Sequence, residues 1–215
     1  MAKRSAQARA RKIKLLMFDV DGVLTDGKLY FIPEDSPQGA SASVLHRTSP
    51  SQIEVKGFHA HDGVASSLAR IAGLKTGLIT RRASETVARR ARDLKIEHVY
   101  QGIQDKRACF EEVARQEGLT PEQAAFVGDD VIDLPAMRAA GLAIAVKNAR
   151  ADVKKEAHYV TPHAGGEGAL RDAVEFILKA QGRLKIVVEQ YVGESSPGKS
   201  RQLSAVSHQR KSKAR

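Results

Sequence analysis

Short apolar runs alternate with longer segments of helical spacing through most of the chain. The runs lie at about residues 14–19, 75–79, 97–100, 124–127, 142–146 and 158–160. Each is long enough for one strand, and the segments between them place apolar residues three and four positions apart. Repeated strand–helix units of this kind predict an α/β fold, with an open, mostly parallel sheet and helices on both faces. Helices are expected to begin at caps near Asp62, Ser84 and Asp105, and a last one covers about 168–181 with an extension over 184–191.

The segment 28–57 departs from this alternation. Residues 28–32 and 52–57 have strand-like composition, and the polar stretch 33–51 between them contains three prolines and many serines. We predict a β-hairpin with a long loop at 33–51. The segment is too short to form an additional domain.

Charge is concentrated at the two ends of the chain. The formal net charge is +10, but residues 1–14 and 199–215 carry twelve of the 35 basic residues and no acid, which leaves 23 basic against 25 acidic residues elsewhere. We therefore predict one domain over 13–191 between disordered basic tails at 1–12 and 192–215. No aromatic platform or zinc module accompanies the basic ends, so specific nucleic-acid binding is not expected.

The remaining composition favours a cytoplasmic protein without a membrane span. No apolar run approaches the roughly 18 residues that cross a bilayer, and the basic N-terminus lacks the apolar segment of a secretory signal. The single cysteine, Cys109, excludes an intrachain disulfide and fits a reducing compartment.

Two carboxylates follow the first predicted strand. Asp19 and Asp21 alternate with Val20, so an extended backbone directs both side chains to one side, and Gly22 permits a tight turn. Two acids held close together favour a divalent cation between them. Taken alone, the pair could also cap backbone groups at a strand exit.

Three further strand ends carry polar groups. Thr80 follows the second core strand, Lys106 stands at the helix start after the third, and Asp129, Asp130 and Asp133 follow the fourth. Each also has an ordinary explanation. Thr80 could cap a helix, Lys106 could be a surface lysine, and the aspartates could be turn residues. The carboxyl ends of parallel strands meet at one edge, where ligands bind in such sheets.

With these four elements in this order, the chain resembles the haloacid dehalogenase superfamily of phosphohydrolases. The resemblance covers about residues 13–181 and implies that superfamily's three-layer Rossmann-like fold. Residues 19–27, 58–63 and 128–135 are similar to the small members that have a hairpin instead of a cap domain and act on 3-deoxy-D-manno-octulosonate 8-phosphate, a step in lipopolysaccharide precursor synthesis.

The resemblance implies a role for each motif residue in phosphomonoester hydrolysis. Asp19 would attack phosphorus and form an aspartyl-phosphate, and Asp21 would act as general acid and then general base. Thr80 and Lys106 would bind the phosphoryl group. Mg²⁺ would be held by Asp19, the main-chain carbonyl of Asp21 and Asp129, while Asp130 and Asp133 would support that site. Hard oxygen ligands favour Mg²⁺ over zinc.

Some positions depart from the family pattern and leave the substrate open. His61 stands where an arginine is common, and Arg81 replaces a glycine that often follows the threonine. His61, Arg81 and Arg82 are possible substrate contacts, and either arginine is equally well explained as a solvated helix-start residue. Alternatives are a nine-carbon keto-deoxy sugar phosphate, a broad range of sugar phosphates, or a non-catalytic binding module. The resemblance also implies a homotetramer in which each hairpin covers a neighbour's site.

Overall fold

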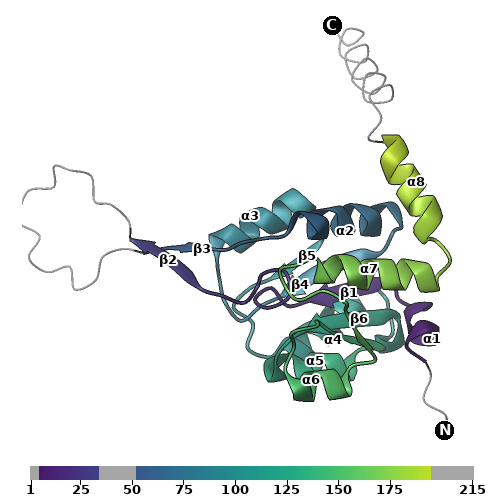
Figure 1. The fold of residues 1–215 in the computed structure, drawn as a ribbon. Coiled ribbons are helices and arrows are strands. Elements are labelled where there is room, and N and C mark those ends of the chain that lie inside the picture. The colour runs from purple at the N-terminus through teal and green to yellow at the C-terminus, as the bar shows by residue number, and fades with distance from the viewer. Residues whose placement is uncertain (1–4, 34–51, 195–215) are drawn as a thin grey trace, which may run out of the picture.

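A computed structural model describes residues 5–33 and 52–194. The main sheet has six parallel strands in the order β5-β4-β1-β6-β7-β8, and two further strands form the separate hairpin (Figure 1). The main strands are β1 (Leu15–Phe18), β4 (Lys75–Ile79), β5 (His98–Tyr100), β6 (Ala124–Gly128), β7 (Leu142–Ala145) and β8 (Tyr159–Val160). The predicted α/β class and the strand positions are confirmed, and the expected range 75–79 is the observed β4.

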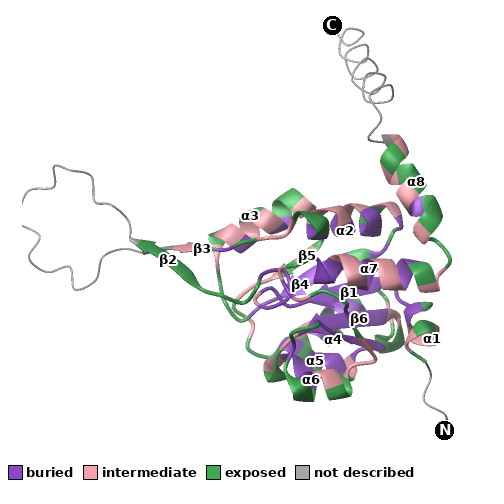
Figure 2. Ribbon diagram, viewed as in Figure 1, coloured by how far each residue is buried: buried purple, intermediate pink, exposed green. Residues whose placement is uncertain are grey.

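Helices cover both faces of this sheet, which gives three layers (Figure 1). On one face lie α2 (Ala60–Ile71), α3 (Glu85–Leu94) and α7 (Ala169–Ala180), and on the other α4 (Lys106–Gln116), α5 (Leu134–Ala139) and α6 (Ala151–Glu156). Two single turns, η1 (Pro121–Gln123) and η2 (Val131–Asp133), flank β6. The central strands are buried on both sides, as Figure 2 shows in purple, because their apolar runs face helices in both directions.

The hairpin consists of β2 (Tyr30–Pro33) and β3 (Gln52–Val55), which pair antiparallel. It projects from the edge of the body (Figure 1). Large apolar side chains on it remain in solvent, among them Phe31 at 50% and Ile32 at 53% exposure. The predicted strand pair is confirmed, whereas the loop expected at 33–51 lies almost wholly outside the described residues.

The expectation of a disordered tail over residues 1–12 is wrong for residues 5–12. Helix α1 (Ala6–Ala10) begins at Ser5, whose side chain accepts a hydrogen bond from the Ala8 N–H. Arg9 Nη1 donates to the Gly141 carbonyl at 2.7 Å, and Ala10 is fully buried. These contacts with the body, rather than helix propensity, stabilise so short a helix.

The end of the described chain is also helical. Helix α8 (Leu184–Glu194) follows α7, so the domain extends three residues past the expected boundary at 191. The rest of the predicted C-terminal tail lies outside the described residues. Within the described part of the chain, no helix has the length and apolarity required to cross a bilayer.

Candidate active site

The candidate site lies where β1 and β6 run side by side. Chain connections leave β1 toward β4 on one side and reach β6 and β7 on the other, so this is the point at which the strand order reverses. The Asp19 N–H continues the pairing by donating to the Val127 carbonyl at 3.0 Å. Ligands of open α/β sheets bind at the carboxyl ends of strands at such a point. The polar residues that follow β1 and β6 therefore meet there.

The turn after β1 is held in one conformation by Gly22 and Thr25. Gly22 has a φ of +88°, which favours glycine, and a Cβ at this position would lie 2.2 Å from Asp129 Oδ2. The Thr25 hydroxyl is buried, accepts from the Gly27 N–H at 3.3 Å and lies 3.4 Å from the Gly22 N–H. Only a residue without a side chain at position 22 lets the first acidic turn approach the second so closely.

Lys106 forms the centre of the site. Its ammonium lies 2.6 Å from Asp19 Oδ2 and 2.7 Å from Asp133 Oδ1. All three side chains are nearly excluded from solvent, at 1%, 5% and 0% exposure in that order. Burial of one cation with two carboxylates requires close pairing, because each charge loses its hydration. Lys106 is therefore part of the site and is not the surface lysine of the ordinary interpretation.

Asp133 uses both of its carboxylate oxygens. Oδ1 accepts from Lys106, while Oδ2 accepts from the Asp129 N–H at 3.0 Å and lies 3.4 Å from the Asp130 N–H. Asp130 is exposed, caps η2 and accepts from the Val131 N–H at 2.6 Å. Asp133 thus connects Lys106 to the loop that carries Asp129. Among the described residues, no hydrogen bond or ion pair joins Asp130 to Lys106.

Three carboxylates offer a fit for a divalent cation. Oxygens of Asp19, Asp129 and Asp133 lie within 4.8 Å of one another, and the buried Oδ1 of Asp129 has no hydrogen-bond partner. Burial raises the pKa of Asp129 to about 7, with the negative charges of Asp133 and Asp19 adding to it, and burial followed by the charge of Asp133 raises the pKa of Asp19 to about 6. A bound cation would favour the ionised forms of both groups. Oδ1 of Asp129, which has no partner, is the best placed of these oxygens to bind a cation.

Thr80 directly follows β4, the neighbour of β1. Its side chain is buried, at 2% exposure, and its hydroxyl accepts from the Arg82 N–H at 3.3 Å. Its backbone N–H and carbonyl are bound to Tyr100 and Ile103, so the residue is fixed at the end of its strand. Thr80 does not cap α3, which begins after Ser84.

Asp21 is surrounded by charges that the sequence motifs did not indicate. Its Oδ1 contacts the ammonium of Lys56, which also lies 3.2 Å from Glu54 Oε1. Lys56 is buried although lysine is rarely so. Sequence reasoning treated both residues as part of a hairpin strand. The signal available was their alternate spacing, which places Glu54 and Lys56 on the same side of an extended segment.

Comparison with known proteins then identifies the family. Residues 80–171 match the model of haloacid dehalogenase-like hydrolases. The 3-deoxy-D-manno-octulosonate 8-phosphate phosphatase KdsC of Escherichia coli K12 is 37% identical over 177 residues, which cover 82% of this chain and 85% of that protein. This chain belongs to the haloacid dehalogenase-like hydrolases. Its relatives are KdsC phosphatases, and it is accordingly a phosphoric monoester hydrolase.

Solved structures of phosphatases share the fold of this hydrolase. The 3-deoxy-D-manno-octulosonate 8-phosphate phosphatase of Yersinia pestis superimposes with a TM-score of 0.73 at 36% identity, covering 84% of this chain and 88% of that one. The Moraxella catarrhalis enzyme, solved in complex with magnesium ion, phosphate ion and a KDO molecule, gives 0.75 at 32% identity, with 86% and 97% covered. The hydrolase therefore has the architecture of these phosphatases over most of its length.

The three possible substrate contacts take different places in the hydrolase. Arg82 forms an ion pair with Glu54, and its Nε lies 4.0 Å from Asp21 Oδ2. Arg81 is exposed, and its side chain makes no hydrogen bond or ion pair with the described residues. His61 is exposed in the first turn of α2, where its ring meets that of His59 edge to face at 4.6 Å. Only Arg82 is brought next to a predicted catalytic group.

The start of α2 differs from the sequence prediction. His59, not Asp62, caps the helix, with its Nδ1 accepting from the His61 N–H at 3.2 Å. Asp62 is buried one turn further on, and its Oδ1 accepts from the Arg171 N–H in α7 at 3.1 Å. Asp62 thus joins α2 to α7, because its carboxylate accepts a hydrogen bond from the backbone of α7 instead of capping its own helix.

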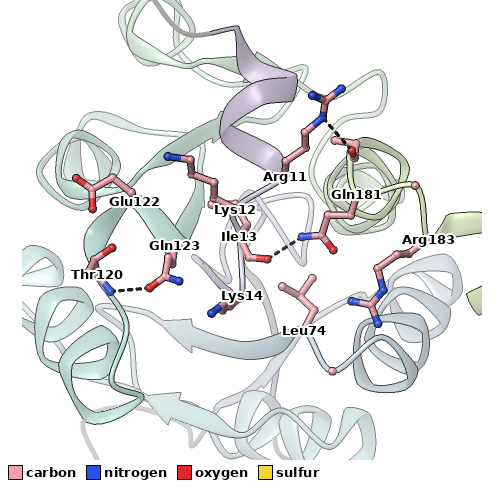
Figure 3. A pocket seen from close by; sticks show the side chains of 13 residues that line it. Arg11, Lys12, Ile13, Lys14, Leu74, Thr120, Glu122, Gln123, Gln181 and Arg183 are labelled. Atoms are coloured by element: carbon pink, nitrogen blue, oxygen red, sulfur yellow. Dashed lines mark hydrogen bonds between the residues drawn. The ribbon is translucent and has the colours of Figure 1, made fainter.

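A hollow lies at the opposite edge of the sheet (Figure 3). It measures about 1140 Å³ and is lined by residues such as Lys12, Leu74, Gln123 and Arg183. These residues come from the segments before β1, β4 and β6 and after α7, so the hollow is at the amino ends of the strands. Gln181 closes part of it by donating to the Ile13 carbonyl at 2.8 Å. It is separate from the carboxylate site of the hydrolase.

Proposed function

We propose that this hydrolase is a cytoplasmic, Mg²⁺-dependent phosphatase that releases phosphate from 3-deoxy-D-manno-octulosonate 8-phosphate. The observation that carries the proposal is the buried contact between Lys106 and Asp19, beside an Asp129 oxygen that lacks a partner. A nucleophile, a fixed cation and a metal ligand at one strand edge are the parts that phosphoryl transfer requires. We infer the substrate from the KdsC relatives named above. This substrate implies a step in lipopolysaccharide precursor synthesis.

In the proposed mechanism Asp19 attacks phosphorus in line with the leaving oxygen. One Asp19 oxygen forms the new bond to phosphorus as the bond between phosphorus and the sugar oxygen breaks, and the Asp21 carboxyl gives its proton to that oxygen. Asp21 then takes a proton from the water that hydrolyses the aspartyl-phosphate. The Val20 N–H donates to Asp19 Oδ1 at 2.7 Å, which fixes the carboxylate for this attack.

Lys106 and Thr80 would hold the phosphoryl oxygens during transfer. Lys106 has a fixed ammonium beside the nucleophile, and Thr80 has a buried hydroxyl at the end of β4. Mg²⁺, held by Asp19, Asp129 and the Asp21 carbonyl, would neutralise charge on the transferring group. Asp133 would hold Lys106 and the Asp129 loop in fixed positions relative to each other, because one of its oxygens accepts from Lys106 and the other from the Asp129 N–H.

The test is a panel of phosphate esters assayed with Mg²⁺ for released phosphate. It compares 3-deoxy-D-manno-octulosonate 8-phosphate with an aldose phosphate of similar length that lacks the carboxylate. We expect the acidic sugar to have the higher kcat/KM by at least about tenfold, since one charge-assisted bidentate contact contributes on that scale. Equal values would replace the specific assignment by a broad sugar phosphatase. No hydrolysis of any ester would favour the non-catalytic module.

A second candidate is a phosphatase of broader range, or one for a nine-carbon keto-deoxy sugar phosphate. The feature that favours it is His61, which has no fixed positive charge where the resemblance places an arginine. The same panel, extended by the nine-carbon ester, distinguishes the two. A higher kcat/KM for the nine-carbon ester would transfer the assignment to it.

We also propose that the hydrolase assembles as a homotetramer through its hairpin. No other described segment pairs with the two strands of the hairpin. Large apolar side chains on or next to these strands are between 38% and 53% exposed, namely those of Leu29, Tyr30, Phe31, Ile32 and Val55. Isolated hairpins are marginal in water, and clustered apolar side chains mark contact surfaces. Light scattering of Phe31→Asp and wild type tests this: the variant should have a lower mass, and an unchanged tetramer would contradict the role of this face.

A further inference from the structure

Lys56 is one of two buried lysines among the described residues, and the other is Lys106. Its side chain is 1% exposed, and its ammonium contacts Asp21 Oδ1 and lies 3.2 Å from Glu54 Oε1. Lys56 directly follows β3, so it reaches the site from the hairpin and not from the main sheet. Burying an ammonium is unfavourable unless it is paired, which makes an incidental placement of this lysine a poor explanation.

Glu54 fixes Lys56. It lies two residues earlier on the same side of the strand and is also paired with Arg82. Four side chains form a continuous chain of contacts from Arg82 through Glu54 and Lys56 to Asp21. The ammonium thus reaches Asp21 as a donor that Glu54 holds in place.

Asp21 needs such a partner because the main sheet does not hold its side chain. The carboxylate is 21% exposed, and its other described partner, Arg82 Nε, is 4.0 Å from Oδ2. With Oδ1 bound to Lys56, Oδ2 is the oxygen that has no close donor among the described residues. A side chain without that contact would sample several rotamers, and proton transfer requires hydrogen-bond reach of the leaving oxygen.

We propose that Lys56 is the positioning residue for Asp21, so that the hairpin, through its last strand, sets the geometry of proton transfer. This role rests on the proposed function. In the step concerned, the proton of the Asp21 carboxyl goes to the leaving oxygen as its bond to phosphorus breaks and the bond from Asp19 forms. Loss of Lys56 should therefore harm esters whose leaving group requires that proton and spare those whose leaving group does not.

The experiment compares kcat/KM for two esters in four proteins. An alkyl ester, 3-deoxy-D-manno-octulosonate 8-phosphate, leaves as an alkoxide that needs the proton, whereas p-nitrophenyl phosphate leaves as a stable phenolate. Lys56→Met removes the donor and keeps the length, Lys56→Arg keeps the charge, and Lys75→Met is the control. Lys75 is also paired with a glutamate, at 3.5 Å, but stands at the start of β4, the opposite end of the sheet.

We expect Lys56→Met to lower kcat/KM for the alkyl ester by about 10- to 100-fold and for the nitrophenyl ester by less than about threefold. Lys56→Arg should recover most of the loss, and Lys75→Met should match wild type with both esters. The ratio of the two kcat/KM values is independent of the folded fraction, so partial unfolding of a variant cannot imitate this result. An equal loss with both esters, or no loss with either, would overturn the positioning role. Absence of hydrolysis in wild type and Lys75→Met would overturn the proposed function and this role together.

Discussion

Asp133 joins Lys106 to the loop that carries Asp129, with Oδ1 2.7 Å from Lys106 Nζ and Oδ2 3.0 Å from the Asp129 N–H. An amide of the same size cannot accept on both sides. Asp133→Asn should therefore lower kcat by about 10- to 100-fold, as losses of supporting hydrogen bonds at metal sites do. Phosphate release measured against Asp152→Asn, an exposed residue of α6, provides the check. Retention of full kcat would exclude Asp133 as a support of the site.

Removal of Asp129 should affect metal affinity before anything else. Its buried Oδ1 has no partner and can bind a cation, while Asp19, the proposed nucleophile, remains in Asp129→Ala. We expect half-maximal activity to require at least about tenfold more Mg²⁺, with partial recovery of kcat at high Mg²⁺. Titration of activity with Mg²⁺ measures this. The same dependence in variant and wild type would remove Asp129 from the coordination shell.

A loop after β8 packs against the turn that carries Asp19 and Asp21. A Cβ on Gly165 would lie 1.7 Å from the Gly22 carbonyl oxygen, and the Gly165 N–H is bound to Asn148 Oδ1 at 2.9 Å, so neither side has room to move. Gly165→Ala should lower stability by about 1–3 kcal/mol and displace Asp19 and Asp21, lowering kcat at least about tenfold. Thermal unfolding and kcat are compared with Gly193→Ala, where a Cβ meets nothing within 4 Å. A variant indistinguishable from that control would show that the contact is not needed.

Asp62 should make stability depend on pH. Burial raises its pKa to about 6, against an opposing hydrogen bond from the Arg171 N–H, so the folded state binds its proton more tightly than the unfolded state does. The contribution of the protonated group is complete below about pH 4 and is lost as pH rises through 6. Asp62→Asn cannot ionise and still accepts from Arg171. It should match wild type near pH 4 and exceed its free energy of unfolding by about 2 kcal/mol at pH 7.

Urea unfolding at the two pH values measures this difference, with exposed Asp152→Asn as control. A gain from Asp62→Asn that is the same at pH 4 and pH 7 would show that the effect does not arise from ionisation.

The parts of the fold that local pattern determines could be predicted from the sequence. The apolar strands lie within about two residues of their expected positions because buried parallel strands need uninterrupted apolar runs. The start of α2 could not be predicted, because His59 and Asp62 are both suitable caps. The choice between them depends on Arg171 in α7, whose N–H binds the Asp62 carboxylate. Helix α1 was missed because it depends on distant contacts with Gly141 and α7.

The candidate site was predictable to the same extent. Asp19, Lys106, Asp129 and Asp133 meet because each follows, or stands close after, a strand of one sheet, which the sequence order indicates. Lys56 reaches Asp21 from a hairpin whose orientation to the sheet has no local signal. Its role therefore becomes visible only in three dimensions.

The proposed mechanism depends most directly on the covalent role of Asp19. Wild-type protein turning over 3-deoxy-D-manno-octulosonate 8-phosphate with Mg²⁺ is quenched in acid, and its peptides are analysed by mass spectrometry. The account predicts one added phosphoryl group on the peptide containing Asp19, absent from Asp19→Asn, which should also have lost more than about 99.9% of kcat, as nucleophile removal commonly does. A phosphoryl group on another residue, or an Asp19→Asn protein that keeps a tenth of wild-type kcat, would contradict it.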